Sequence, residues 1–102
     1  MSSPVRHPAW CDPARCAAGT EPPAGTHCSR LIVLGPYPPG TLVAEVSAAQ
    51  GPSIPGYPWS GRPYLVLGLR DDEAELCLAP MSVELAGALG RVLTSLVAEV
   101  QQ

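Results

Sequence analysis

HPAWCDPARC (residues 7–16), near the N-terminus, and the pair His27-Cys28, which follows it after a loop, concentrate the side chains of this sequence that can bind a soft metal. Both histidines of the chain and three of its four cysteines fall within these 22 residues. Residues 1–29 also contain five prolines and no periodic apolar pattern, so apolar burial alone cannot order them. Clustered imidazole and thiol side chains bind soft metals, and the cluster therefore predicts a structural zinc site.

The predicted ligands are separated by intervals that zinc proteins use. His7 and Cys11 lie four positions apart, Cys16 follows after five more, and His27 returns across a loop rich in glycine and proline. Zinc sites pair ligands roughly two to five residues apart and bring the others from across a loop. We therefore expect Zn²⁺ to be held by His7, Cys11, Cys16 and His27, with Cys28 as an alternative to either histidine.

The sequence around the cluster does not indicate catalysis. A catalytic zinc keeps one open coordination position, whereas four protein ligands fill the shell. The His-Glu-x-x-His motif and the His-x-Glu motif of zinc deaminases are absent, and no third histidine remains for acid–base chemistry. The acidic run at residues 71–75 is expected to be a solvated turn, and no glycine-rich phosphate loop occurs. We predict no enzyme, no catalytic residues and no organic cofactor; a small metal-dependent enzyme is the least favoured alternative.

The same motif resembles that of small actinobacterial proteins from a domain family of unknown function. Those proteins carry a ligand-Pro-x-Trp-Cys sequence, a second Cys or His a few residues later, and a returning His followed shortly by Ser. Here the pattern is met by residues 7–11, by Cys16 and by residues 27–29. The family similarly continues with strands and an amphipathic C-terminal helix introduced by a proline, as Pro80 does here. The resemblance implies a metal-binding head and brings no activity with it.

The composition indicates a small globular protein and disfavours nucleic-acid binding. The 102 residues are 46% hydrophobic and 15% charged, a balance typical of a single folded domain. The net charge is −3 and six residues are basic, whereas nucleic-acid binders present a basic face. Residues 1–4 lack the pattern of a secretory signal, and the apolar C-terminal segment carries three charges. We therefore expect a cytoplasmic protein that does not enter a membrane.

After the head (residues 1–29), apolar periodicities predict an α+β fold. Apolar runs and period-two alternation predict three or four antiparallel strands, at residues 31–34, 41–48, 63–69 and 73–79. The first two form a hairpin, Pro80 ends the last, and Cys77 on that strand is interpreted as a buried thiol. Apolar residues at helical spacing then predict one long amphipathic helix, capped by Ser82. The head and residues 30–102 are expected to form one compact domain.

A single helix covers only one face of such a sheet, which leaves the second face too apolar for exposure to water. The residues expected there are Ile32 or Leu34, Val43, Tyr64, Val66 and Cys77. We expect either the metal-bound head or a second chain to cover this face. The protein is therefore predicted to be a homodimer or to bind a protein partner.

The long loop at residues 49–62 carries two aromatic side chains, Tyr57 and Trp59, among its prolines and glycines. Exposed aromatics suit a partner-binding site, and packing of the loop onto the body explains them equally well. The sequence thus predicts a zinc-stabilised module for protein interaction or regulation, with no small-molecule substrate. The alternative is a zinc-ribbon-like nucleic-acid-binding regulator, supported by three arginines in or beside the head. These are Arg6, Arg15 and Arg30.

Overall fold

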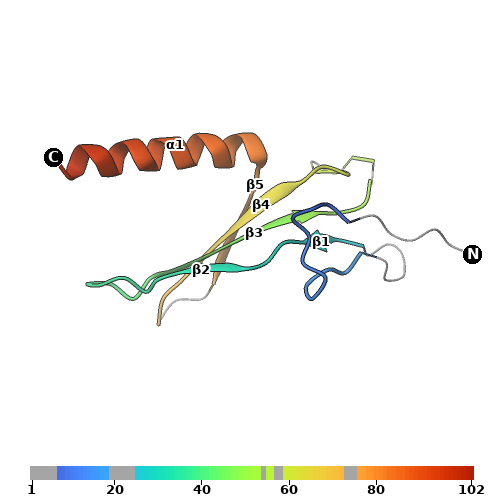
Figure 1. Cartoon of the computed structure of the whole chain (residues 1–102), viewed down its shortest axis with the longest axis horizontal. Coiled ribbons are helices and arrows are strands. Elements are labelled where there is room, and N and C mark those ends of the chain that lie inside the picture. Colours follow the sequence, from blue (N-terminus) through green and yellow to red (C-terminus); the bar gives the residue numbers. More distant parts are fainter. Residues whose placement is uncertain (1–6, 19–24, 54, 57–58, 73–75) are drawn as a thin grey trace, which may run out of the picture.

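The computed structural model of the chain describes residues 7–18, 25–53, 55–56, 59–72 and 76–102. It contains one antiparallel sheet and one C-terminal helix, which confirms the α+β fold class (Figure 1). The elements are β1 (His27–Cys28), β2 (Ile32–Leu34), β3 (Val43–Gln50), β4 (Tyr64–Arg70), β5 (Cys77–Ser82) and α1 (Val83–Val100). Across the described ranges, no helix combines the length and apolar character needed to cross a bilayer.

Strand β3 connects the two halves of the sheet. One side of β3 pairs with β4, which pairs in turn with β5, and the other side pairs with both β1 and β2. β2 and β3 form the predicted hairpin, with Ile32 opposite Val46. The two-residue strand β1 lies inside the predicted irregular head, and it joins the sheet with His27 opposite Gln50. The head is therefore attached to β3 by backbone pairing as well as by the chain itself.

The prediction that Pro80 ends the sheet is wrong. Pro80 lies inside β5, opposite Val66, and the strand continues to Ser82. In the described sheet β5 is an edge strand, which needs ladder hydrogen bonds on one side only and so tolerates a residue without an N–H. The first part of the predicted strand, residues 73–75, lies outside the described residues.

Cys77 also differs from its prediction as a buried thiol, because the structure leaves it exposed. It lies opposite Leu69 in the pairing of β4 with β5, and directly opposed residues share a face of the sheet. Cys77 therefore belongs to the face that carries Leu65, Leu67 and Leu69, not to the second face. Its position near the start of an edge strand explains the exposure.

Helix α1 begins where the sequence predicts. The Ser82 hydroxyl accepts a hydrogen bond from the Leu85 backbone N–H over 3.1 Å and caps the helix. Glu84 lies in the first turn, where the helix dipole favours a carboxylate. The helix contacts β4 and β5, and every residue from Gly90 onward is exposed as α1 extends along the sheet (Figure 1).

The core that this arrangement creates is small. Among the described residues, Ala49 is the one buried hydrophobic residue, and no large side chain is fully buried. The molecule measures 59 × 28 × 25 Å and has a radius of gyration of 16.4 Å. A compact chain of this length has a radius of gyration of about 13 Å. In a single copy of the chain, most apolar side chains therefore remain in contact with solvent.

Candidate metal centre

Two tight turns bring the N-terminal ligand candidates together. The first closes where the Cys11 N–H donates to the Pro8 carbonyl over 3.0 Å. In the second, the Arg15 N–H donates to the Asp12 carbonyl over 2.9 Å. Aspartate favours the first position of such a turn, and the proline that follows it fixes the backbone angle φ. The second turn reverses the chain between Cys11 and Cys16.

Backbone hydrogen bonds attach this arm to the returning segment. The Asp12 N–H donates to the Cys28 carbonyl over 2.8 Å, and the Ala17 N–H donates to the Thr26 carbonyl over 2.9 Å. His27 and Cys28 form β1, which pairs with β3. The sheet thus fixes the position of His27, and the N-terminal arm is fixed against His27 in turn.

Ser29 connects the head to the sheet more extensively than its neighbours do. Its N–H donates to the Ala48 carbonyl over 2.8 Å, and its hydroxyl accepts from the Ala48 N–H over 2.7 Å. The Arg15 guanidinium donates to the Ser29 carbonyl over 2.8 Å. Ser29 is not one of the predicted metal ligands, so the spacing of those ligands gives no reason to single it out. The signal that points to it is the serine two positions after the returning histidine in the family motif.

The four predicted ligand residues converge on one point. The Cys11 Sγ lies 3.5 Å from the His7 Nδ1 and 3.6 Å from the His27 Nδ1. The Cys16 Sγ lies 3.6 Å and 3.5 Å from the same two nitrogens. All four atoms lie within 4.8 Å of one another, and the two imidazole rings are close to perpendicular, at 85°. His7 is exposed and the other three residues are half-buried, so the group could hold a metal ion at the surface of the head.

Hydrogen bonds alone do not account for these four contacts. An imidazole Nδ1 has one in-plane position, which carries either a proton or a lone pair, so each nitrogen makes one directed hydrogen bond. Each Nδ1 here faces two sulfur atoms at nearly equal distances. A cation between the four atoms would satisfy both sulfurs and both nitrogens at once.

Cys28, the alternative ligand, lies outside this group of four. It follows His27 in β1, and successive side chains of a strand point to opposite faces. Cys28 lines a pocket of about 370 Å³ with Arg15 and Ala49, on the face of the sheet that also carries Val66. Only His27 of the pair therefore faces the two N-terminal cysteines.

The surroundings of the Cys11 thiol favour a positive charge beside it. Desolvation raises the pKa of the Cys11 thiol above its usual value, and Cys16 raises it further through a hydrogen bond and charge repulsion. A hydrogen bond from the Cys28 backbone lowers the Cys11 pKa in part. The Ala18 N–H lies 3.3 Å from the Cys16 Sγ and donates to it. Backbone donors alone leave the Cys11 thiolate disfavoured, whereas a bound cation would stabilise it.

The aromatic loop is described in part. Tyr57, like Arg6 of the head, lies outside the described residues. Trp59 is half-buried, and its ring stacks on Tyr64 at a centroid distance of 5.2 Å and an interplanar angle of 27°. Tyr64 is the first residue of β4, so this contact joins the end of the loop to the sheet. The stacking favours the packing interpretation of Trp59 over the partner-binding one.

Comparison with known proteins leaves the geometry as the basis for assigning a function. No known family model matches the chain, and neither a curated protein nor a solved structure matches it. The resemblance to the actinobacterial family therefore stays a prediction from the motif. What the fold and the site define is a small α+β protein with a His₂Cys₂ cluster at one edge of its sheet.

Proposed function

We propose that the chain is a protein-interaction module whose head is held in place by a structural zinc ion. The observation that carries the zinc assignment is the set of four sulfur–nitrogen distances of 3.5–3.6 Å. With Zn–S bonds of about 2.3 Å and Zn–N bonds of about 2.05 Å, a tetrahedral centre separates sulfur from nitrogen by about 3.6 Å. The four sulfur–nitrogen distances thus agree with those between the ligands of a tetrahedral zinc ion.

The donor set supports zinc over other common metals. Two thiolates and two imidazoles in a tetrahedral arrangement suit Zn²⁺, whereas magnesium and calcium take oxygen ligands. The chain's cysteines are all free thiols, which suits a zinc protein of the reducing cytoplasm. We therefore infer a cytoplasmic location from the same side chains.

The site supports a structural role because all four positions are supplied by the protein. His7, Cys11, Cys16 and His27 would leave no open position for water or a substrate. In the described part of the chain, these four residues make up the one group of this kind. Closing such a site contributes on the order of 10 kcal/mol in zinc-finger peptides, comparable to the whole stability of a small domain, about 5–15 kcal/mol. The metal would order a head that lacks an apolar core of its own.

An interaction role is supported by the apolar surface that the fold leaves exposed. On the helix-facing side of the sheet and on α1, the large apolar side chains of Leu34, Leu93 and Leu96 are 47%, 54% and 50% exposed. Monomeric proteins rarely leave contiguous apolar surface of this extent in water. The exposed apolar surface therefore supports binding of another protein, and the complete set of protein ligands supports a non-catalytic role.

Metal analysis of protein purified without chelators tests the zinc assignment. We expect about one zinc per chain in the unmodified protein and a loss of most of it in Cys11→Ser, because the substitution removes one of four ligands. Cys28→Ser is the matched control, since Cys28 lies beside a ligand but faces away from the cluster, and it should keep its zinc. Absence of zinc from the unmodified protein, or equal loss in both variants, would contradict the proposal.

A further inference from the structure

A groove between α1 and the sheet is lined by apolar side chains. It has a volume of about 580 Å³, and every side chain that lines it is apolar. The sheet contributes residues of β2, β3, β4 and β5, and the helix contributes Ala86, Leu89, Gly90 and Leu93. Leu93 is still 54% exposed, so the helix and the sheet do not close over the groove. An aqueous groove of this composition is unfavourable, because each Å² of apolar surface left in water costs about 25 cal/mol.

The C-terminal half of α1 extends this apolar surface beyond the residues that line the groove. Leu96, Val97 and Val100 are 50%, 50% and 79% exposed. They continue the apolar face that begins at Leu85 and Leu89, at helical spacing. The charged residues of the helix, Glu84, Arg91 and Glu99, fall outside this face.

The exposed area has the size of a dimer interface. The chain exposes 7831 Å². A compact globular chain of 10.6 kDa exposes about 5,500 Å², which leaves an excess of about 2,300 Å². Stable homodimers bury about 2,000–5,000 Å² in total, or about 1,000–2,500 Å² from each chain. The excess, taken over the whole chain, falls within the range that one subunit of an obligate dimer contributes.

We propose that a second copy of this chain fills the groove, in a two-fold symmetric dimer where the C-terminal half of each α1 packs into the groove of the other copy. This inference rests on the proposed interaction function and names its partner. A symmetric dimer requires a surface that is complementary to itself. One copy offers both parts of such a surface, an apolar helix face without a partner and an apolar groove without an occupant. If the helix of each copy fills the groove of the other, both grooves and both apolar helix faces are covered, and no charged side chain is buried.

Sedimentation equilibrium of the zinc-loaded full chain tests the proposal. We expect a mass of about twice 10.6 kDa that falls to the monomer mass only on strong dilution. Leu96→Glu is expected to raise the dimer dissociation constant about 100-fold or more, since two carboxylates would be buried in the interface. In a monomer the same change would be harmless, because Leu96 is half-exposed and glutamate is a good helix former.

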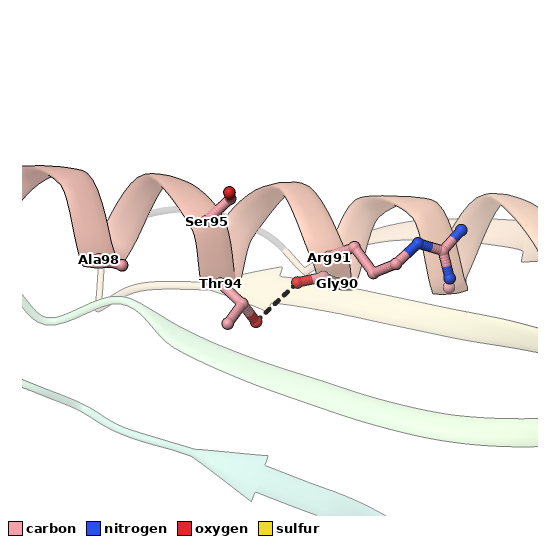
Figure 2. A pocket seen from close by; sticks show the side chains of 6 residues that line it. Gly90, Arg91, Thr94, Ser95 and Ala98 are labelled. Carbon is pink, nitrogen blue, oxygen red and sulfur yellow. Dashed lines mark hydrogen bonds between the residues drawn. The ribbon is translucent and has the colours of Figure 1, made fainter.

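Ser95→Glu is the matched control, because it adds the same charge at the neighbouring position. Figure 2 shows Ser95 on the side of α1 turned away from the strands and Thr94 on the side nearer to them, with the Thr94 hydroxyl donating to the Gly90 carbonyl over 2.8 Å. We expect Ser95→Glu to remain dimeric. Should Leu96→Glu fail to fold by circular dichroism, Leu96→Ala serves in its place, with an expected rise of about tenfold or more in the dissociation constant.

Several results would overturn the proposed dimer. A monomer at all concentrations, an open series of larger assemblies, or equal dissociation of Ser95→Glu and Leu96→Glu would each do so. Zinc content measured on the same samples separates this inference from the proposed function. A zinc-loaded monomer would contradict the dimer alone, whereas a dimer without zinc would contradict the structural metal site alone.

Discussion

At the scale of single residues, His27 and Cys28 show what strand geometry adds to ligand spacing. Both side chains bind zinc well, and their distance along the chain from Cys11 and Cys16 suits either. The backbone of both pairs with β3, and strand alternation then turns only His27 toward the cluster. A strand of two residues has no periodicity of its own, so the sequence leaves this choice open and the sheet decides it.

Trp59 can be assigned to packing or to partner binding by its effect on stability. We expect Trp59→Ala to lower the free energy of unfolding by about 1–2 kcal/mol, because the half-buried ring would lose its stacking on Tyr64. Urea unfolding of the zinc-loaded protein, followed by circular dichroism, measures the change. Tyr37→Ala is the control, since Tyr37 is 71% exposed, and should stay within about 0.5 kcal/mol. Unchanged stability in Trp59→Ala would instead mark the ring as a contact for a partner.

At the scale of elements, periodicity predicts most of the fold. The hairpin of β2 and β3, strand β4 and helix α1 appear within a few residues of their expected ranges, because each has a clear alternation or helical repeat. The misplaced end of β5 has a specific cause. A proline is not tolerated in a strand that is paired on both sides, so from the sequence Pro80 is expected to end the strand. The sequence does not reveal that β5 is an edge strand, where a proline is tolerated.

Replacing a glycine of α1 with alanine should stabilise the protein, whereas the same change at a loop glycine with a positive φ should destabilise it. We expect Gly87→Ala to raise the free energy of unfolding by about 1 kcal/mol, the difference in helix propensity. A Cβ at Gly87 would approach only the movable Arg91 guanidinium, at 3.4 Å. Chemical denaturation at a fixed protein concentration measures the change.

Gly56→Ala is the control of opposite sign for this helix variant. Gly56 has a φ of +87° and no atom within 4 Å of an added Cβ, so backbone strain alone should destabilise this variant, by about 1 kcal/mol. A loss of stability in Gly87→Ala would contradict the expectation and would indicate that another surface packs closely on that flank of the helix.

At the scale of the whole molecule, the metal centre and the groove lie in different regions. The head is joined to the sheet at β1, and the C-terminal end of α1 lies at the opposite end of the molecule (Figure 1). The sequence predicts an apolar second face that the head or another chain must cover, and Leu78 on that face is 58% exposed. The open groove on the helix side is a further apolar surface that the sequence does not predict. Arg15, Thr26 and Cys28 of the head flank the second face, and the open groove lies under the helix. Sequence periodicity indicates which residues share a face of the sheet. It does not indicate how closely α1 packs on that face, because the angle of the helix is set where β5 joins α1 at Ser82.

This separation predicts that removing zinc will loosen the head without dissociating the dimer. The Asp12 and Ala17 amides donate to carbonyls of the returning arm, and the proposed metal would cross-link the same two arms. After treatment with a chelator we expect hydrogen exchange at these two amides to accelerate about tenfold or more, because local opening no longer breaks metal bonds. Amides of Val66 and Leu67, in a strand paired on both sides, should keep their protection. Exchange mass spectrometry and sedimentation of the same sample measure both effects. Loss of protection throughout β4 would mean that the metal holds the entire fold, and unchanged exchange in the head would mean that it holds none of it.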